Sequence, residues 1–194
     1  MKLSKLTLIA FVGALISCAH ENSARSLPAY SSDALLSALS LYCGKSFAGT
    51  IIANEPEAPD DSFVGKTLNM HVRDCSASQF KVPFHVGTDH SRTWEFTVVG
   101  KQLQLKHEHR HADGELDELT DYGGTSTRQS SANRAEFPVD AASKALFDRT
   151  GRQVSMTNVW AVEITQDQQF IYELTRPGRV FRVAFDLTMP VKVP

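Results

Sequence analysis

Apolar and polar side chains alternate along most of the chain, and a period of two residues predicts β-strands. The clearest stretch is 102–111, which divides its side chains between two faces. One face carries Leu103, Leu105, His107, His109 and His111, and the other carries Gln102, Gln104, Lys106, Glu108 and Arg110. Three histidines therefore continue an apolar face, and this makes the strand the first place to look for a site.

A tight turn fixes how this strand pairs with the strand that comes before it in the sequence. The Gly-Lys pair at 100–101 suits a two-residue type II′ turn. Such a turn places Trp94 opposite His107 and Arg92 opposite His109 on one face of the hairpin. The pattern therefore predicts that an arginine and an aromatic ring lie beside the histidines.

The pairing with the strand that comes after it depends on a second turn. The Asp-Gly pair at 113–114 suits a type I′ turn, which places His109 opposite Glu118. A three-residue turn would shift the pairing by one and set Glu108 opposite Glu118. Like charges directly opposite each other are unfavourable, so we favour the two-residue turn. It predicts an inner patch formed by His90, Arg92, His109, His111 and Glu118.

The same reasoning covers the rest of the chain. His71 and His85 fall on the polar faces of their strands, and we interpret both as surface residues. A helix at 34–41 would follow Asp33 as N-cap, and a second at 141–148 would follow Pro138 and Asp140. The segment 125–134 is almost free of apolar side chains and predicts the start of a strand that runs into a mobile loop. Further strands are predicted at 47–52, 68–72, 80–86, 157–165, 169–176 and 179–187.

These elements predict a single domain over residues 33–190. About nine short strands, mostly joined by tight turns, and two short helices favour a mainly β fold. We expect an antiparallel meander closed or nearly closed as a barrel, and a two-sheet β-sandwich is the alternative. A turn at 177–178 would pair Arg176 with Arg179 and set Tyr172 opposite Val183.

The first residues have the pattern of an export signal. Lys2 and Lys5 precede an apolar run at 6–16 that is too short to span a bilayer as a mature helix. We therefore expect residues 1–17 to be a signal peptide. Residues 18–32 contain few large apolar side chains and are typical of a tether that leads to the domain.

The apolar run ends in Leu15-Ile16-Ser17-Cys18, which resembles the lipobox of bacterial lipoproteins. The resemblance implies cleavage before Cys18, lipidation of its sulfur and anchoring in a membrane through acyl chains. Because Ala19 and not Asp follows the cysteine, it also implies the outer membrane, with the domain facing the periplasm. The alternative is an ordinary signal cut after Ala19, which would give a soluble periplasmic or secreted protein.

Charge and cysteine content narrow the function classes. The 20 basic and 22 acidic residues form no block of one sign, so no nucleic-acid partner is indicated. Cys43 and Cys75 are an even pair in an oxidising compartment, which predicts a disulfide. A redox or metal-binding thiol pair is the alternative, but the Cys-x-x-Cys spacing typical of such sites is absent from the sequence.

The histidine face supports one chemical hypothesis. Side chains two residues apart on a strand point the same way at roughly 6 to 7 Å, so two imidazoles can reach one zinc ion. His107, His109, His111 and Glu118 are the candidate zinc ligands, and a bound water would allow hydrolysis. His90 and Arg92 are candidates for an anion-binding or polar pocket. The alternative is a wet barrel mouth in which the histidines bond Glu118 and solvent.

Other patterns are less specific. Ser91 and Ser126 do not lie in the Gly-x-Ser-x-Gly pattern of hydrolases, so a catalytic triad is not indicated. The strand aromatics are expected to fill the core, with a lined ligand cavity as the alternative. They are Trp94, Phe96, Trp160, Phe170, Tyr172, Phe181 and Phe185.

Together these features favour a lipid-anchored cell-envelope protein whose barrel is a non-enzymatic binding or structural module. Its partner would be a small molecule or another envelope protein, and no cofactor is expected. The alternative is a zinc-binding or metal-dependent hydrolytic protein. A third hypothesis, an inhibitor or assembly partner, rests on the loop at 125–134 alone.

Overall fold

The computed structural model describes residues 32–57, 61–127, 131 and 133–193. The predicted signal peptide, Cys18 and nearly all of the tether lie outside these residues, and so does part of the loop predicted at 125–134. Among the described residues, no helix is both long and apolar enough to cross a membrane.

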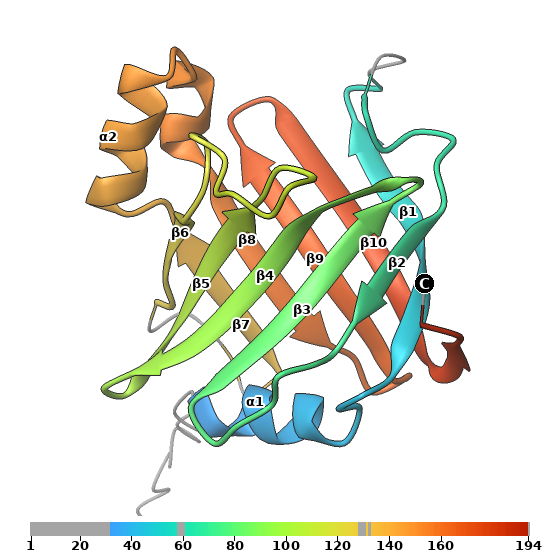
Figure 1. The fold of residues 1–194 in the computed structure, drawn as a ribbon. Coiled ribbons are helices and arrows are strands. Elements are labelled where there is room, and N and C mark those ends of the chain that lie inside the picture. Colours follow the sequence, from blue (N-terminus) through green and yellow to red (C-terminus); the bar gives the residue numbers. More distant parts are fainter. Residues whose placement is uncertain (1–31, 58–60, 128–130, 132, 194) are drawn as a thin grey trace, which may run out of the picture.

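One antiparallel sheet contains all ten strands of the described residues, in the order β6-β5-β4-β3-β2-β1-β10-β9-β8-β7 (Figure 1). The strands are β1 (Ser46–Glu55), β2 (Leu68–His71), β3 (Gln79–Val86), β4 (Asp89–Val99), β5 (Gln102–His109), β6 (Tyr122–Thr125), β7 (Arg134–Pro138), β8 (Val159–Ile164), β9 (Gln169–Arg176) and β10 (Arg179–Val191). Strands that follow one another in the sequence pair with each other, except for β6 and β7, which form the two edges of the sheet and meet only through a short bridge. In addition, the last strand, β10, pairs with the first, β1. This is the predicted meander, nearly closed as a barrel, and not a sandwich.

The sheet edges β6 and β7 meet at two glycines. Gly124 forms an isolated bridge with Val139, and the Asp140 N–H donates to the Gly123 carbonyl at 2.9 Å. A Cβ on Gly124 would lie 1.9 Å from the Pro138 carbonyl oxygen, and one on Gly123 would lie 1.9 Å from a backbone oxygen of β5. The Gly-Gly pair therefore allows the backbone contact that brings the barrel close to closure.

Two helices match the prediction. Helix α1 (Ser32–Ser40) starts two residues earlier than expected, so Asp33 lies within it. Helix α2 (Ala141–Arg149) begins after Asp140, whose Oδ1 accepts from the Ser143 N–H at 2.8 Å as an N-cap. The short 3-10 helix η1 (Gln153–Thr157) follows α2.

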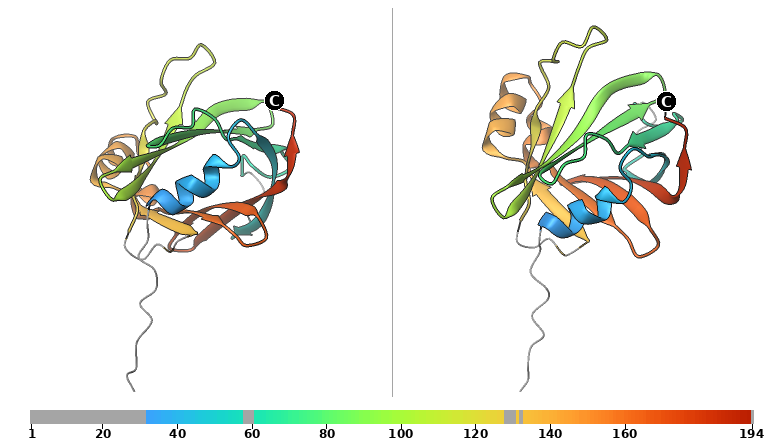
Figure 2. Two further views of the ribbon diagram at one scale, coloured as in Figure 1. Left: turned by 90° about the horizontal axis from the view of Figure 1, so that it is seen from below. Right: turned by 60° about the horizontal axis from the view of Figure 1, so that its bottom comes forward.

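Helix α1 lies across one end of the barrel, which is plain when the molecule is seen from below (Figure 2). Its side chains Leu35, Leu36 and Leu39 are buried in the core. The predicted disulfide between Cys43 and Cys75 is present, and it joins the chain after α1 to the connection between β2 and β3. One end of the barrel is thus covered by apolar packing and a covalent link.

The register of two hairpins agrees with the prediction. In β4 and β5, Trp94 lies opposite His107 and Arg92 lies opposite His109. In β9 and β10, Tyr172 lies opposite Val183. The strand aromatics are all buried. Phe96, Phe170 and Phe185 fill the core as expected, whereas Trp94, Trp160, Tyr172 and Phe181 line a cavity, which was the alternative.

The connection from β5 to β6 differs from the prediction. A three-residue turn at 112–114 pairs Arg110 with Leu116, which is the alternative that we did not favour. The expected repulsion does not arise, because β6 starts only at Tyr122 and the acidic segment before it leaves the ladder. The Glu108 carboxylate instead accepts two hydrogen bonds from Arg110 at 2.8 Å.

The tenth strand, β7, was not predicted. It lies where the sequence indicated the end of a loop and the start of a helix. Its buried residues are Ala135 and Phe137, so only two alternating apolar positions mark it. A pattern this short does not distinguish a strand from a loop.

Candidate functional site

A cavity of about 200 Å³ lies inside the barrel. It is lined by Phe63, Phe84, Arg92, Thr93, Trp94, His107, His109, Tyr122, Trp160, Tyr172, Leu174 and Phe181. Helix α1 packs near Phe80 at the start of β3, whereas Phe84, in the second half of β3, lines the cavity. The cavity therefore lies toward the end of the barrel that α1 leaves open.

His107 is the most deeply buried polar group of the cavity. Its Nδ1 lies 3.1 Å from the Tyr122 carbonyl oxygen, and its Nε2 lies 2.8 Å from the Tyr172 hydroxyl. Since a carbonyl only accepts, Nδ1 carries the proton and Nε2 accepts from Tyr172. Burial lowers the pKa of His107 to about 3, so the ring is neutral. Both nitrogens are occupied, and neither offers a lone pair to a metal ion.

Flat aromatic rings form one wall of the cavity. Trp94 stacks on Tyr172 with ring centroids 4.4 Å apart and planes 15° apart, and it stacks on Phe84 at 4.6 Å and 18°. Burial raises the pKa of Tyr172 well above its usual range, so this hydroxyl stays protonated. The wall therefore consists of parallel, uncharged rings.

His109 forms a second pair with a tyrosine. Its Nε2 lies 2.9 Å from the Tyr122 hydroxyl. Burial lowers the pKa of His109, and the Arg92 charge lowers it further, while Asp117 and Asp89 oppose the shift. Burial also raises the pKa of Tyr122 to about 12. Both members of the pair are therefore neutral near pH 7.

Arg92 brings a positive charge to the cavity. Its Nη1 lies 2.5 Å from the Asp89 Oδ2, and its guanidinium lies 5.5 Å from the centroid of the Phe63 ring. Burial would raise the pKa of Asp89, but hydrogen bonds from Ser91 and Arg92 lower it to about 2. The ion pair is therefore fully charged at neutral pH.

Three residues predicted for the inner patch lie elsewhere. His111 is exposed, with its Nδ1 3.9 Å from the Asp117 Oδ2, and Glu118 is also exposed. His90 is exposed and stacks on His85 with ring centroids 3.9 Å apart. The shifted turn after β5 is the reason for the first two, because the chain beyond His109 leaves the inner face.

The structure thus brings together Arg92, His107 and His109 and does not add His111 or Glu118. Within the described ranges, no group of three or more His, Cys, Asp or Glu side chains could hold a metal ion. The geometry of the predicted zinc ligands therefore gives the metal hypothesis no support.

Phe63 is a cavity residue that the sequence did not indicate. It comes from the connection between β1 and β2, where no alternation marks it. Its ring lies 4.9 Å from that of Phe181, and the Arg179 Nη2 binds the nearby Asp61 at 2.7 Å. This ion pair spans 118 residues of sequence, so no local pattern could have placed Phe63 at the cavity.

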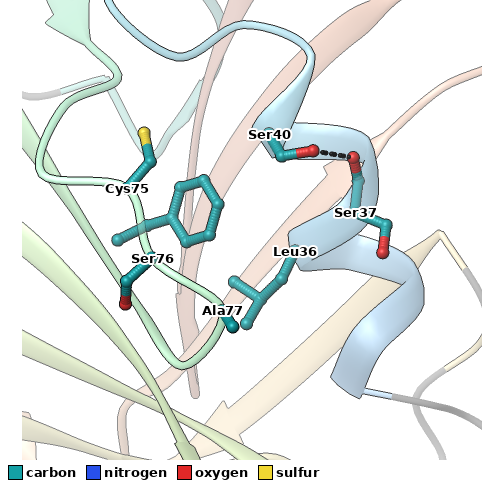
Figure 3. A pocket seen from close by; sticks show the side chains of 7 residues that line it. Leu36, Ser37, Ser40, Cys75, Ser76 and Ala77 are labelled. Atoms are coloured by element: carbon teal, nitrogen blue, oxygen red, sulfur yellow. Dashed lines mark hydrogen bonds between the residues drawn. The ribbon is translucent and has the colours of Figure 1, made fainter.

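A second hollow of about 500 Å³ lies between α1 and the chain before β3 (Figure 3). The Ser40 hydroxyl donates to the Ser37 carbonyl at 2.7 Å, and the Ser76 hydroxyl donates to the Gln79 carbonyl at 3.2 Å. Among the described residues, the lining of this hollow has no acidic, basic or cationic side chain. It consists of Leu36, Ser37, Ser40, Cys75, Ser76, Ala77 and Phe80. The barrel cavity is therefore the better candidate for a functional site.

Comparison of this chain with protein-family models, with curated proteins and with solved structures gave no match. The functional argument consequently rests on the cavity and on the pattern of the sequence.

Proposed function

We propose that this chain is a lipid-anchored envelope protein whose barrel binds a small ligand with a flat apolar body and does not transform it. The signal pattern and the lipobox at Cys18 support export and anchoring. The disulfide between Cys43 and Cys75 fits an oxidising compartment.

The observation that carries the binding proposal is the aromatic cavity. Its volume of about 200 Å³ is slightly larger than an apolar cavity of ~150 Å³ that holds benzene. A pocket of apolar rings with a few polar groups is the usual form of a small-molecule site. His107 supports binding rather than catalysis, because both of its nitrogens are engaged inside the protein.

The binding proposal can be tested with toluene and benzyl alcohol as probes, by saturation-transfer NMR on the purified protein. We expect both probes to bind. Leu174→Trp would fill the cavity and abolish binding, whereas Val99→Trp, at an exposed position before a turn, would leave it unchanged. If neither probe binds the wild type, or if both still bind Leu174→Trp, the cavity is not the site.

The anchoring proposal has a separate test. In cells labelled with palmitate, the wild-type protein should carry the label and sediment with membranes. Cys18→Ser should lose both properties, because no other cysteine precedes the predicted domain. A labelled Cys18→Ser protein, or an unlabelled wild type, would contradict lipidation at this residue.

A further inference from the structure

The charge balance of the cavity favours an anion. Arg92 is the one cationic side chain among the described residues that line it, and this lining has no carboxylate. The partner Asp89 is outside the lining, and its side chain is 44% exposed against 20% for Arg92. Water and salt screen the exposed carboxylate more strongly than the guanidinium that faces the cavity. Over the described ranges, the lining of the cavity therefore presents one cation and no carboxylate to a ligand.

The guanidinium also has free donors. Only its Nη1 is engaged by a carboxylate within the described part of the chain. Arginine carries five N–H groups in a planar fork, which matches the two oxygens of a carboxylate. Nε and Nη2 can therefore donate to a ligand while Asp89 keeps its own contact.

The pair of His109 and Tyr122 supplies a further donor in either of its two arrangements. If the Tyr122 hydroxyl donates to Nε2, then neutral His109 carries its proton on Nδ1, which has no partner among the described residues. If Nε2 donates instead, the Tyr122 O–H keeps its proton free to donate. In both cases the pair offers one donor beside Arg92, so an acceptor group of the ligand is satisfied at this end.

The aromatic stack beside Arg92 selects for shape, because Phe84 lies directly opposite Arg92 in the pairing of β3 and β4. Phe84, Trp94 and Tyr172 are stacked face to face, so they present ring edges to a ligand, and the positive edges favour the face of an aromatic ring over a bulky aliphatic group. The volume of about 200 Å³ accepts one ring and a small substituent but not a long acyl chain. Edge-to-face contact and size together point to a single aromatic ring.

We infer that the cavity binds a small aromatic carboxylate, with its ring against the edges of the Phe84–Trp94–Tyr172 stack and its carboxylate on Arg92 and the His109–Tyr122 pair. This inference rests on the proposed binding function and adds the chemical class of the ligand. A bidentate contact between arginine and carboxylate orients the ligand as well as attracting it. The neutral amide of the same acid lacks the charge and one of the acceptor oxygens.

The test compares benzoate with benzamide by calorimetry at pH 7.5 on the purified full chain. We expect benzoate to bind at least ten-fold more tightly than benzamide. Arg92→Gln should weaken benzoate at least ten-fold and change benzamide less than two-fold. Arg110→Gln is the matched control, because Arg110 is exposed and binds Glu108 outside the cavity, and it should leave the ratio unchanged. Cyclohexanecarboxylate should bind more weakly than benzoate.

The outcomes separate the ligand class from the function itself. If benzamide equals benzoate in the wild type, the anion is overturned while the cavity remains a binding site. If neither benzoate nor benzamide binds while toluene does, the aromatic carboxylate is overturned and the cavity remains a binding site. If toluene and benzyl alcohol fail as well, both proposals fall. If cyclohexanecarboxylate equals benzoate, the aromatic requirement is overturned. The ratio of benzoate to benzamide affinity in the wild type decides the question even if Arg92→Gln does not fold. Arg92→Lys keeps the charge but lacks the planar guanidinium, so it should give an intermediate ratio.

Discussion

Acid should destabilise this protein through His107. Burial lowers the pKa of this ring from its ordinary value of 6.5 to about 3. In the unfolded chain the imidazole takes up a proton near pH 6.5, whereas in the folded protein it stays neutral until about pH 3. The unfolded state therefore binds more protons between these values, and the free energy of unfolding falls as the pH falls through this window.

The size of this effect follows from the difference in pKa. A pH of 5 is 1.5 units below the ordinary imidazole pKa of 6.5, which applies in the unfolded chain. Each unit is worth about 1.4 kcal/mol, so His107 alone should remove about 2 kcal/mol of stability between pH 7 and pH 5. This is a large share of the stability of a typical domain.

The assay is urea unfolding at pH 7 and pH 5, followed by far-UV circular dichroism. His107→Gln keeps a donor and an acceptor but cannot titrate, so its loss between the two pH values should be about 2 kcal/mol smaller than that of the wild type. Leu105→Ala is the control, because this buried neighbour on β5 carries no titrating group and should keep the wild-type loss. If His107→Gln loses as much as the wild type, the ring is not held neutral by burial.

Three further changes test the fold. Gly124→Ala would place a Cβ 1.9 Å from the Pro138 carbonyl oxygen, so it should lower the free energy of unfolding by about 2 kcal/mol or more, measured in urea. Replacing Cys43 and Cys75 by Ser opens a link between residues 32 positions apart and should cost roughly 4 kcal/mol, seen as a lower midpoint of thermal unfolding. Asp140→Ala removes the N-cap of α2 and should cost about 1 kcal/mol, with faster amide exchange in its first turn. Unchanged stability in any of these variants would contradict the corresponding contact.

Local turn chemistry explains which strand pairs were predictable. The hairpin of β4 and β5 has a two-residue turn with glycine first, and alternation on both strands agrees with a single register, so Trp94 and His107 were paired correctly. For the connection from β5 to β6, charge pairing was the one criterion for choosing between a two-residue and a three-residue turn. β6 starts at Tyr122, which lies opposite His107, and its Gly124 forms a bridge with Val139, so no turn pattern next to β5 marks where the strand begins.

The same distinction applies to the site. Arg92, His107 and His109 were predicted to lie together because they share one face of one hairpin, and all three line the cavity. Glu118 and His111 were added through the turn at 113–114, and they are exposed because the register there is different. A prediction of side-chain grouping was reliable within a regular hairpin and failed one turn beyond it.

The two ends of the barrel are not equivalent, and this decides where a ligand can reach the cavity. At one end α1 buries Leu35 and Leu39 in the core, and the disulfide holds the chain that follows it. Toward the other end, Phe63 lines the cavity with one partly buried ring, and Asp61 of the same connection binds Arg179. Moving one ring exposes far less apolar surface than removing a helix, so the cost of opening is lower at the Phe63 end. We therefore expect a ligand to reach Arg92 and the aromatic stack from this end of the barrel.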